Sequence, residues 1–191
     1  DGDYALVMIS DLLLNTNPDF IKTVVGTIMS NLGLEMALKQ RDIKLVRTGV
    51  GDRLVYEEMK KRNAVLGGEQ SGHIILRDFQ KTGDGILTAL LFLRALMILD
   101  MKIGDVRRLI VPQAQVTENI PVKKKRELRN WDEFNRLIDG FYHRYGDNSR
   151  LVIRYSGTES LIRVMMESKH EQIISENLNK FVDLIKSNIG E

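Results

Sequence analysis

Apolar residues recur at two different intervals along the first half of the chain, and each interval predicts one kind of element. Residues 5–14 place apolar side chains three and four positions apart, which is typical of one buried helix face. Short β-branched runs at 23–29 and 44–48 predict buried strands. Each run leads into a predicted helix, the first ending at Leu38 and the second at Lys61. Alternating strands and helices predict a mixed or parallel sheet covered by helices.

A further pair of apolar runs, 64–66 and 73–76, brackets a glycine-rich polar loop at 67–72. After this loop, residues 84–99 predict a long helix. The helical period selects five positions for its buried side, namely Leu87, Leu90, Leu91, Ala95 and Ile98.

The second half of the chain predicts a different order of elements. The pattern indicates a strand at 115–122, a helix at 131–144, strands at 150–155 and 161–167, and a helix at 171–189. This order predicts a small α+β domain in which an antiparallel sheet carries helices on one face. Because the composition changes around 104–112, we expect a first domain at 1–105, a linker at 106–112 and a second domain at 113–191.

Composition and charge exclude several classes of protein. The 191 residues are 43% hydrophobic and 28% charged, which is ordinary for a globular protein. A formal charge of +2 is too small to predict a nucleic-acid partner. The densest basic run, 123–126, has only Trp131 nearby as a stacking aromatic, so we interpret it as a solvated loop or helix start. The absence of cysteine excludes disulfides, thiol nucleophiles and zinc–thiolate sites.

The sequence also bears on location. No apolar run approaches the roughly 20 residues of a membrane-spanning helix, and no basic-then-apolar leader precedes a small-residue cleavage site. We therefore expect no membrane partner and a cytoplasmic protein. Because the chain starts without methionine and inside a motif, we expect it to be a piece of something longer.

The first three residues, Asp1, Gly2 and Asp3, allow two interpretations. Two carboxylates around a glycine could begin a divalent-metal loop, because hard cations prefer oxygen ligands. Alternatively, Asp3 could be the N-cap of the helix that follows, its carboxylate accepting a free backbone N–H. We favour the cap, since a metal loop would more plausibly follow a strand and a turn.

The loop at 68–73 gathers an acid, an amide, a hydroxyl and an imidazole between glycines. Glu69 offers two acceptor oxygens that could span neighbouring hydroxyls of a polyol. A polar hairpin turn whose side chains only contact water stays an open alternative. The glycine pair before Asp52 could likewise place donors at a ligand, although such pairs more often form a tight strand-to-helix turn.

The segment from Arg154 to Arg163 is the second candidate. Two guanidinium groups, the hydroxyls of Ser156 and Thr158, and the backbone around Gly157 could cradle an anion such as phosphate. The alternative is a glycine hairpin with two solvated arginines.

Five motifs occur in order along the chain: TVVGTIMSNLGLE at 23–35, VGDR at 50–53, GEQSGH at 68–73, TGDG at 82–85, and SGTE at 156–159 with IRVM at 162–165. In this order they resemble the C-terminal half of the phosphohexomutase superfamily. The resemblance implies the third domain, a mixed-sheet α/β/α unit, and the fourth, a sheet-and-helix unit like the TATA-binding-protein fold.

The resemblance implies an isomerase that transfers a phosphoryl group through a phosphoserine and a sugar bisphosphate. The phosphoserine and the Asp-Gly-Asp-Gly-Asp-Arg loop that holds Mg²⁺ belong to the first two domains. We therefore expect no metal bound to this chain and no activity from it alone. Its implied partners are a hexosamine phosphate and the missing N-terminal domains, and a homodimer stays open.

The resemblance also implies roles for individual residues. Glu69 and Ser71, with the turn of Gly51, Asp52 and Arg53, would bind the sugar, while His73 would assist binding or proton transfer. The phosphate that is not transferred would be held by Arg154, Ser156, Gly157, Thr158 and Arg163.

Two positions depart from the superfamily, because Tyr155 and Ser160 stand where proline is usual. Proline restricts φ, so its loss predicts a less rigid phosphate loop. Gln70 and the pair Asp52-Arg53 favour enzymes of glucosamine phosphate, which serve cell-wall precursor synthesis, over those of mannose or glucose phosphate. A phosphomannomutase or phosphoglucomutase, and a sugar-phosphate-binding module without catalysis, are the alternatives.

Overall fold

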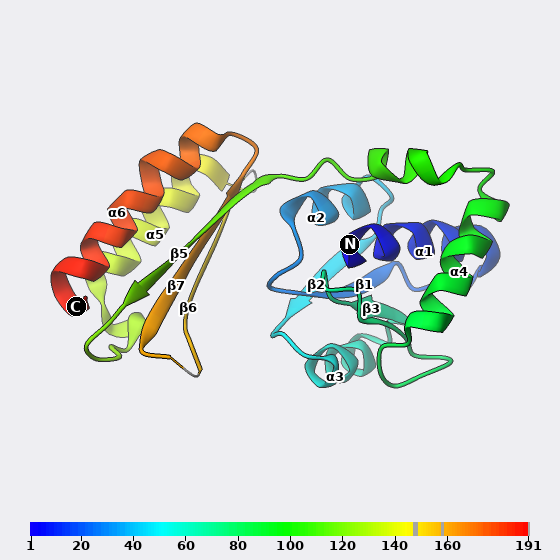
Figure 1. The fold of residues 1–191 in the computed structure, drawn as a ribbon, viewed down its shortest axis with the longest axis horizontal. Helices are drawn as coiled ribbons and strands as arrows, with labels where there is room; N and C mark the ends of the chain where they lie inside the picture. Colours follow the sequence, from blue (N-terminus) through cyan, green and yellow to red (C-terminus); the bar gives the residue numbers. More distant parts are fainter. Residues whose placement is uncertain (147–148, 158, 191) are drawn as a thin grey trace. The chain divides into compact units, whose positions relative to one another are not determined.

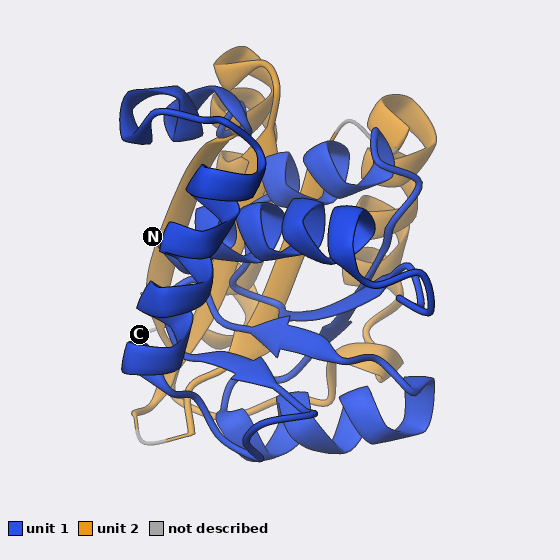
Figure 2. Ribbon diagram, turned by 90° about the vertical axis from the view of Figure 1, so that its right-hand side faces the viewer, with its two compact units in different colours: residues 1–112 blue, residues 113–191 orange. Residues whose placement is uncertain are grey.

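The computed structural model describes residues 1–146, 149–157 and 159–190. The chain divides into two compact units, Asp1–Pro112 and Gln113–Glu191, which are coloured separately in Figure 2. Each unit has its own sheet and its own hydrophobic core.

The first unit is an α/β/α layer structure (Figure 1). Its mixed sheet has the order β2-β1-β3-β4, with β1 parallel to both of its neighbours and β3 antiparallel to β4. The elements are α1 (Gly2–Thr16), β1 (Thr23–Thr27), α2 (Leu32–Lys39), β2 (Lys44–Thr48), α3 (Asp52–Arg62), β3 (Leu66–Gly68), β4 (Ile74–Leu76), α4 (Gly85–Ile98) and the 3₁₀ helix η1 (Ile103–Arg108).

The alternation of side chains along β1 explains why both faces of this sheet are covered. Val24 and Val25 are both fully buried, and successive residues of a strand point to opposite faces. Val24 packs in the cluster with Leu6 of α1 and Leu34 of α2, whereas Val25 packs with Val55 of α3. The predicted sheet covered by helices is therefore confirmed.

The structure corrects the predicted linker at 106–112. Val106, in η1, is buried against α1 and α4, and Ile110 is buried in the main core of the first unit. A Cβ added to Gly33 at the start of α2 would collide with the Val111 carbonyl oxygen. This segment is held by the first unit, which extends to Pro112.

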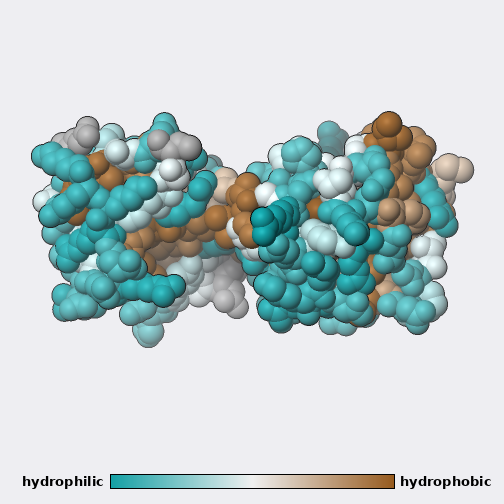
Figure 3. Space-filling model, turned by 90° about the horizontal axis from the view of Figure 1, so that it is seen from below, coloured by the Kyte–Doolittle hydropathy of each residue, from teal (hydrophilic) through white to brown (hydrophobic). Residues whose placement is uncertain are grey.

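The predicted buried side of α4 is also wrong in part. Ala95 is buried, and Leu87 and Leu91 pack partly buried against the core, but Leu90 is 60% exposed and Ile98 is 45% exposed. The helix is apolar on most sides, so its pattern does not select one face. Figure 3 shows hydrophobic residues gathered on the surface of this unit, and the exposed ones of α4 are Ile86, Leu90, Leu93, Met97 and Ile98.

The second unit is an antiparallel sheet of order β5-β7-β6 with two helices on one face (Figure 1). Alternate residues of β7, Ile162, Val164 and Met166, are buried and pack with Phe134 and Phe181 of the helices. The predicted α+β arrangement is confirmed. Its elements are β5 (Ala114–Pro121), η2 (Leu128–Asn130), α5 (Asp132–Tyr145), β6 (Ser149–Tyr155), β7 (Leu161–Ser168) and α6 (Glu171–Ile189).

None of the helices within the described part of the chain is long and apolar enough to cross a membrane.

Candidate functional site

The turn between β3 and β4 fixes Glu69 at the end of a buried strand. Gly68 pairs with Ile74 across the hairpin, and the Glu69 N–H donates to the His73 carbonyl oxygen over 3.0 Å. The Gly72 N–H donates back to the Glu69 carbonyl oxygen over 2.9 Å, with Gly72 at a φ of +104° that favours glycine. The loop is a tight turn, and Glu69 is only 7% exposed.

The first residues of α1 hold the same loop from another side. The Gly2 N–H donates to the Gln70 carbonyl oxygen over 2.8 Å. A Cβ at Gly2 would collide with the Glu69 carbonyl oxygen, so this close approach requires glycine. The start of the chain therefore supports the loop through its backbone.

The start of α3 brings a second carboxylate to Glu69. Gly51, at a φ of +123°, donates its N–H to Glu69 Oε1 over 2.8 Å. The next residue, Asp52, accepts at Oδ2 from the Thr82 hydroxyl over 2.8 Å and from the Gly83 N–H over 2.9 Å. Each carboxylate thus has one oxygen fixed by donors of the protein.

His73 faces the other oxygen of each carboxylate. Its Nδ1 lies 3.4 Å from Glu69 Oε2 and 4.0 Å from Asp52 Oδ1. Burial raises the pKa of Asp52, but the Gly83 N–H, the Thr82 hydroxyl and the charge of His73 outweigh it, so the pKa lies below its ordinary value. Asp52 is therefore ionised at neutral pH.

Two predicted sugar-binding residues lie differently. Ser71 is exposed on the loop, with its Oγ 3.5 Å from His73 Nδ1. Arg53 points away from the cluster, since its side chain is 89% exposed and its guanidinium pairs with Glu57 at 2.9 Å. The structure brings Gly51, Asp52, Glu69, Ser71 and His73 together and leaves Arg53 outside.

An open cavity of about 490 Å³ lies beside this cluster. Cavities of about 300–1,000 Å³ are typical of small-molecule sites. Its lining offers carboxylate, amide and hydroxyl groups from the described residues Asp1, Thr27, Met29, Val50, Glu69, Gln70 and Ser71.

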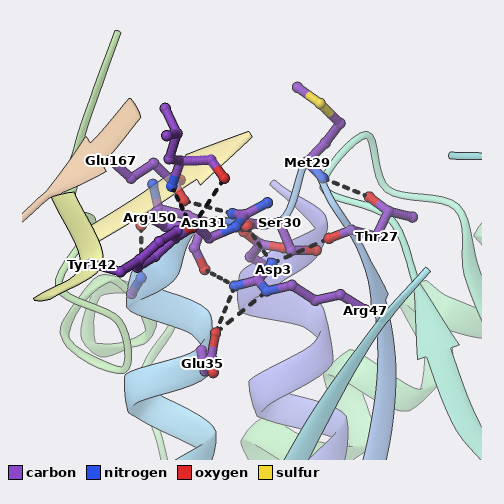
Figure 4. A network of polar contacts seen from close by, with 12 residues as sticks. Asp3, Thr27, Met29, Ser30, Asn31, Glu35, Arg47, Tyr142, Arg150 and Glu167 are labelled. Atoms are coloured by element: carbon purple, nitrogen blue, oxygen red, sulfur yellow. Dashed lines mark hydrogen bonds and ion pairs between the residues drawn. The ribbon is translucent and has the colours of Figure 1, made fainter. Parts of the chain in front are cut away.

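The structure also changes the interpretation of Asp1 and Asp3. Asp1 is the N-cap of α1, its side chain accepting from the Asp3 N–H over 3.1 Å. Asp3, predicted as the cap, is instead a buried residue of the first turn whose Oδ2 accepts from the Asn31 N–H over 2.9 Å (Figure 4). Asn31 and Asp84 are the N-caps of α2 and α4, and their side chains accept from the N–H groups of Gly33 and Leu87.

Arg47 completes this support at the carboxyl end of β1. Its Nη1 donates to the Ser30 carbonyl oxygen over 2.6 Å and to the Thr27 carbonyl oxygen over 3.2 Å, while Nη2 pairs with Glu35 at 3.1 Å (Figure 4). Asp3 and Arg47 therefore both bind the segment 27–31, which places Met29 in the cavity lining.

The second candidate loop connects β6 to β7 in the other unit. Ser156 is buried, and its N–H donates to the Leu161 carbonyl oxygen over 2.9 Å. Arg154 and Arg163 are direct partners in the strand register, so two cationic side chains lie side by side on one face. Gly157 lies in the turn, and Thr158 lies outside the described residues.

Glu159 occupies part of this basic loop. Its Oε2 lies 3.1 Å from Arg163 Nη2 and 3.4 Å from Ser156 Oγ, and its N–H donates to Ser156 Oγ over 3.2 Å. Arg163 Nε is buried and has no hydrogen-bond partner among the described residues. A bound anion would therefore compete with the Glu159 carboxylate for Arg163.

Lys125 joins this loop, which the sequence did not predict. Its Nζ donates to the Ser156 carbonyl oxygen over 3.0 Å, and Tyr155 exchanges two hydrogen bonds of 2.9 Å with the backbone of Arg126. The run at 123–126 is thus brought to the loop by the pairing of β5 with β7. Tyr155, at a position where the resemblance predicts proline, connects the loop to that run.

Two family models describe this pair of an α/β/α unit and a sheet-and-helix unit. The family model "Phosphoglucomutase/phosphomannomutase, alpha/beta/alpha domain III" matches residues 1–112, and the model of the C-terminal domain matches residues 118–184. The chain belongs to the phosphoglucomutase/phosphomannomutase family, as the superfamily resemblance predicted.

Curated relatives align with nearly the whole length of the chain. It is 38% identical over 190 residues to the phosphoglucosamine mutase of Geotalea uraniireducens, covering 100% of this chain and 42% of that protein. It is 41% identical over 187 residues to the phosphoglucosamine mutase of Brucella ovis, and the alignment covers 98% of this chain and 41% of that protein. The chain therefore spans less than half the length of these curated relatives.

Solved structures share the fold at low identity. The N-acetylphosphoglucosamine mutase of Aspergillus fumigatus superposes with a TM-score of 0.80 at 16% identity, covering 98% of this chain and 43% of that one. The same enzyme in complex with GlcNAc-6P and magnesium gives a TM-score of 0.71, also at 16% identity, covering 98% and 44%.

Proposed function

We propose that this chain is the sugar-binding and phosphate-binding part of a phosphoglucosamine mutase, which interconverts glucosamine 6-phosphate and glucosamine 1-phosphate. The observation that carries the proposal is the fixed carboxylate of Glu69 in the loop 68–73. One of its oxygens is held by the Gly51 N–H, and the side chain borders an open cavity. A carboxylate held in this way can accept hydrogen bonds from sugar hydroxyls without first losing side-chain freedom.

The second unit would hold a phosphate. Arg154 and Arg163, neighbours in the strand register, offer guanidinium donors that suit phosphate oxygens, and Lys125 adds a third cation at Ser156. The hydroxyl of Ser156 and the backbone at Gly157 are the other proposed contacts. Thr158 stays a predicted contact outside the described residues.

The phosphoryl transfer itself would be supplied by the rest of the protein. We propose a phosphoserine that donates its phosphoryl group to the sugar, a bisphosphate that turns over, and return of the other phosphate to the serine. Residues here would orient the sugar and meet the charge of the phosphate that stays in place. The proposed partners are hexosamine phosphate and the preceding domains, and we propose no turnover by this chain alone.

The residues at the start of the chain do not fit the Mg²⁺ that the family implies. Asp1 spends its carboxylate on capping α1, and Asp3 is buried with its carboxylate on the Asn31 N–H. We therefore assign no Mg²⁺ ligand to Asp1 or Asp3, and no step here is routed through that ion.

An amide-shift NMR titration of this chain with glucosamine 6-phosphate, glucosamine and inorganic phosphate tests the proposal. We expect binding on the order of millimolar, about −4 kcal/mol, because the other domains are not in the chain. Glucosamine should shift residues 68–73, phosphate should shift residues 154–163, and glucosamine 6-phosphate should shift both sets.

Matched variants sharpen this experiment. Glu69→Gln should abolish the sugar shifts, while Glu58→Gln, whose carboxylate in α3 pairs with Lys61 and Arg62 outside the cluster, should leave them. Arg154→Ala should abolish the phosphate shifts, while Arg136→Ala, on the surface of α5, should not. Shifts that survive Glu69→Gln and Arg154→Ala would contradict the proposal.

Phosphomannomutase or phosphoglucomutase activity would appear as a preference of the whole protein for mannose or glucose phosphates. Sugar-phosphate binding by a whole protein that performs no turnover would favour the non-catalytic module.

A further inference from the structure

Asp52, Glu69 and His73 form a compact cluster of metal-ligating side chains. One ligand atom from each, a carboxylate oxygen or an imidazole nitrogen, lies within 4.8 Å of the other two. His73 Nδ1 is 3.4 Å from Glu69 Oε2 and 4.0 Å from Asp52 Oδ1. The three residues come from the start of α3 and from the two sides of the turn between β3 and β4.

These separations match the first coordination shell of a transition-metal ion. Zinc binds imidazole nitrogen and carboxylate oxygen at about 2.0–2.2 Å, so two ligands in tetrahedral positions lie about 3.4 Å apart and wider angles approach about 4.2 Å. Both measured distances to His73 fall in this interval. The His73 side chain is 65% exposed, so its imidazole can turn toward an ion held between the two carboxylates.

The carboxylates are also oriented by the protein before any ligand arrives. Glu69 Oε1 is held by the Gly51 N–H, and Asp52 Oδ2 by the Thr82 hydroxyl and the Gly83 N–H. The second oxygen of each carboxylate, Glu69 Oε2 and Asp52 Oδ1, is the one that faces His73. Outer hydrogen bonds of this kind orient the ligands of metal sites in proteins.

Charge and access select the class of ion. Two carboxylates and a neutral imidazole give a formal charge of −2, which attracts a divalent cation. A mixed set of oxygen and nitrogen ligands suits Zn²⁺, Co²⁺ or Ni²⁺, whereas Mg²⁺ and Ca²⁺ prefer oxygen ligands alone. The His73 side chain is 65% exposed and that of Asp52 is 30% exposed, so an ion can enter from solvent and keep water in its remaining positions.

We propose that Asp52, Glu69 and His73 bind one divalent transition-metal ion, Zn²⁺ being the physiological candidate, and that this ion blocks the sugar site. The block rests on the proposed function, because it requires Glu69 to be a contact of the sugar. The metal site itself rests on the three residues alone.

Titration of the 191-residue chain with Co²⁺, followed by its visible absorption in metal-free buffer at pH 7, tests the site. We expect one Co²⁺ per chain and displacement by an equivalent of Zn²⁺. His73→Gln should weaken Co²⁺ binding at least tenfold, and the Thr82→Val variant, which removes an outer hydrogen bond, should weaken it by about tenfold.

The other two histidines of the chain are the matched controls. His143→Gln and His170→Gln should bind Co²⁺ as the native chain does, since neither residue belongs to the cluster. Amide NMR spectra establish that each variant is folded. Equal binding by native chain and His73→Gln, or an equal loss in the His143→Gln or His170→Gln variant, would overturn the metal site.

The proposed block of the sugar site by the metal ion is tested separately. With EDTA present, glucosamine shifts at residues 68–73 test the proposed function alone. With one equivalent of Zn²⁺, the same shifts should require a glucosamine concentration at least tenfold higher. Zn²⁺ binding at His73 with unchanged glucosamine affinity would overturn the block and leave the metal site standing.

Discussion

Asp3 is a buried carboxylate that binds the backbone at the start of α2, a separate segment of the chain. It is 2% exposed, and its Oδ2 accepts from the N–H of Asn31, the residue that caps α2. Helix capping at Asp1 and loop support at Asp3 are thus two separate functions of the first turn. The sequence pattern placed the cap at Asp3 because a tertiary hydrogen bond leaves no local signal.

The first prediction concerns the stability that Asp3 supplies. Asp3→Ala should lower the free energy of unfolding by about 1–3 kcal/mol, because it removes a buried acceptor and leaves a donor behind. The Asp78→Ala variant, at an exposed position, should change it by less than about 0.5 kcal/mol. Urea denaturation curves give both values, and equal effects of the two substitutions would show that the buried bond contributes nothing.

The second prediction follows from the ionised state of Asp52. Its folded-state pKa lies below the ordinary value of 3.8, so its contribution to stability is present above that pH and is lost as pH falls through the folded value. In EDTA, the free energy of unfolding of the native chain should therefore fall more steeply below about pH 4 than that of Asp52→Asn. Parallel curves for the two proteins over this acid range would contradict the assignment.

The third prediction concerns Glu159, which lies against Arg163 in the phosphate loop. Replacing this carboxylate removes a competitor for the guanidinium and a negative charge from the loop. Glu159→Gln should tighten binding of inorganic phosphate several-fold, measured by NMR titration, and the gain should shrink at high salt. Glu171→Gln, at the start of α6, is the charge-matched control. An equal increase in phosphate affinity in both variants would show that only the net charge of the chain matters.

Part of the two sites could be predicted from residues alone. Glu69 and His73 lie in one short loop, and Arg154 and Arg163 flank one turn, so local sequence indicated each set. The approach of Asp52 to His73 depends on α3 meeting the β3–β4 turn, and that of Lys125 to Ser156 depends on β5 pairing with β7. Such contacts join segments far apart in the chain, which local patterns do not describe.

At the scale of elements, α4 shows where hydrophobic periodicity fails. Its residues are apolar around most of the helix, so the 3.6-residue period gave Leu90 and Ile98 a buried position that they do not have. The strands were easier to predict, because the fully buried Val24 and Val25 belong to a short β-branched run between polar segments.

The fourth prediction separates exposed from buried leucines. Leu90→Ala in α4 should change the free energy of unfolding by less than about 0.5 kcal/mol, because the side chain is 60% exposed. Leu38→Ala in α2 should cost about 2–5 kcal/mol, because that side chain is fully buried in the main core. Urea denaturation of both variants decides, and a comparable loss from Leu90→Ala would mean that α4 is covered in solution.

At the scale of the whole chain, each unit carries a separate hydrophobic core. Phe134 and Phe181 meet edge to face in the second unit, with ring centres 5.8 Å apart, while Leu66 and Leu38 lie in the main core of the first. Because each core is built from residues of one unit, a core substitution should act on the opening of its own unit.

The fifth prediction tests this division by hydrogen exchange. Phe181→Ala should lower the protection of amides in residues 113–191 by the equivalent of about 3–5 kcal/mol and leave those of 1–112 nearly unchanged. Leu66→Ala, at a fully buried position of β3, should do the reverse. Exchange followed by mass spectrometry reads both units in one sample. If both variants loosened both units equally, the chain would unfold as a single cooperative body, and the two candidate loops would share one stability.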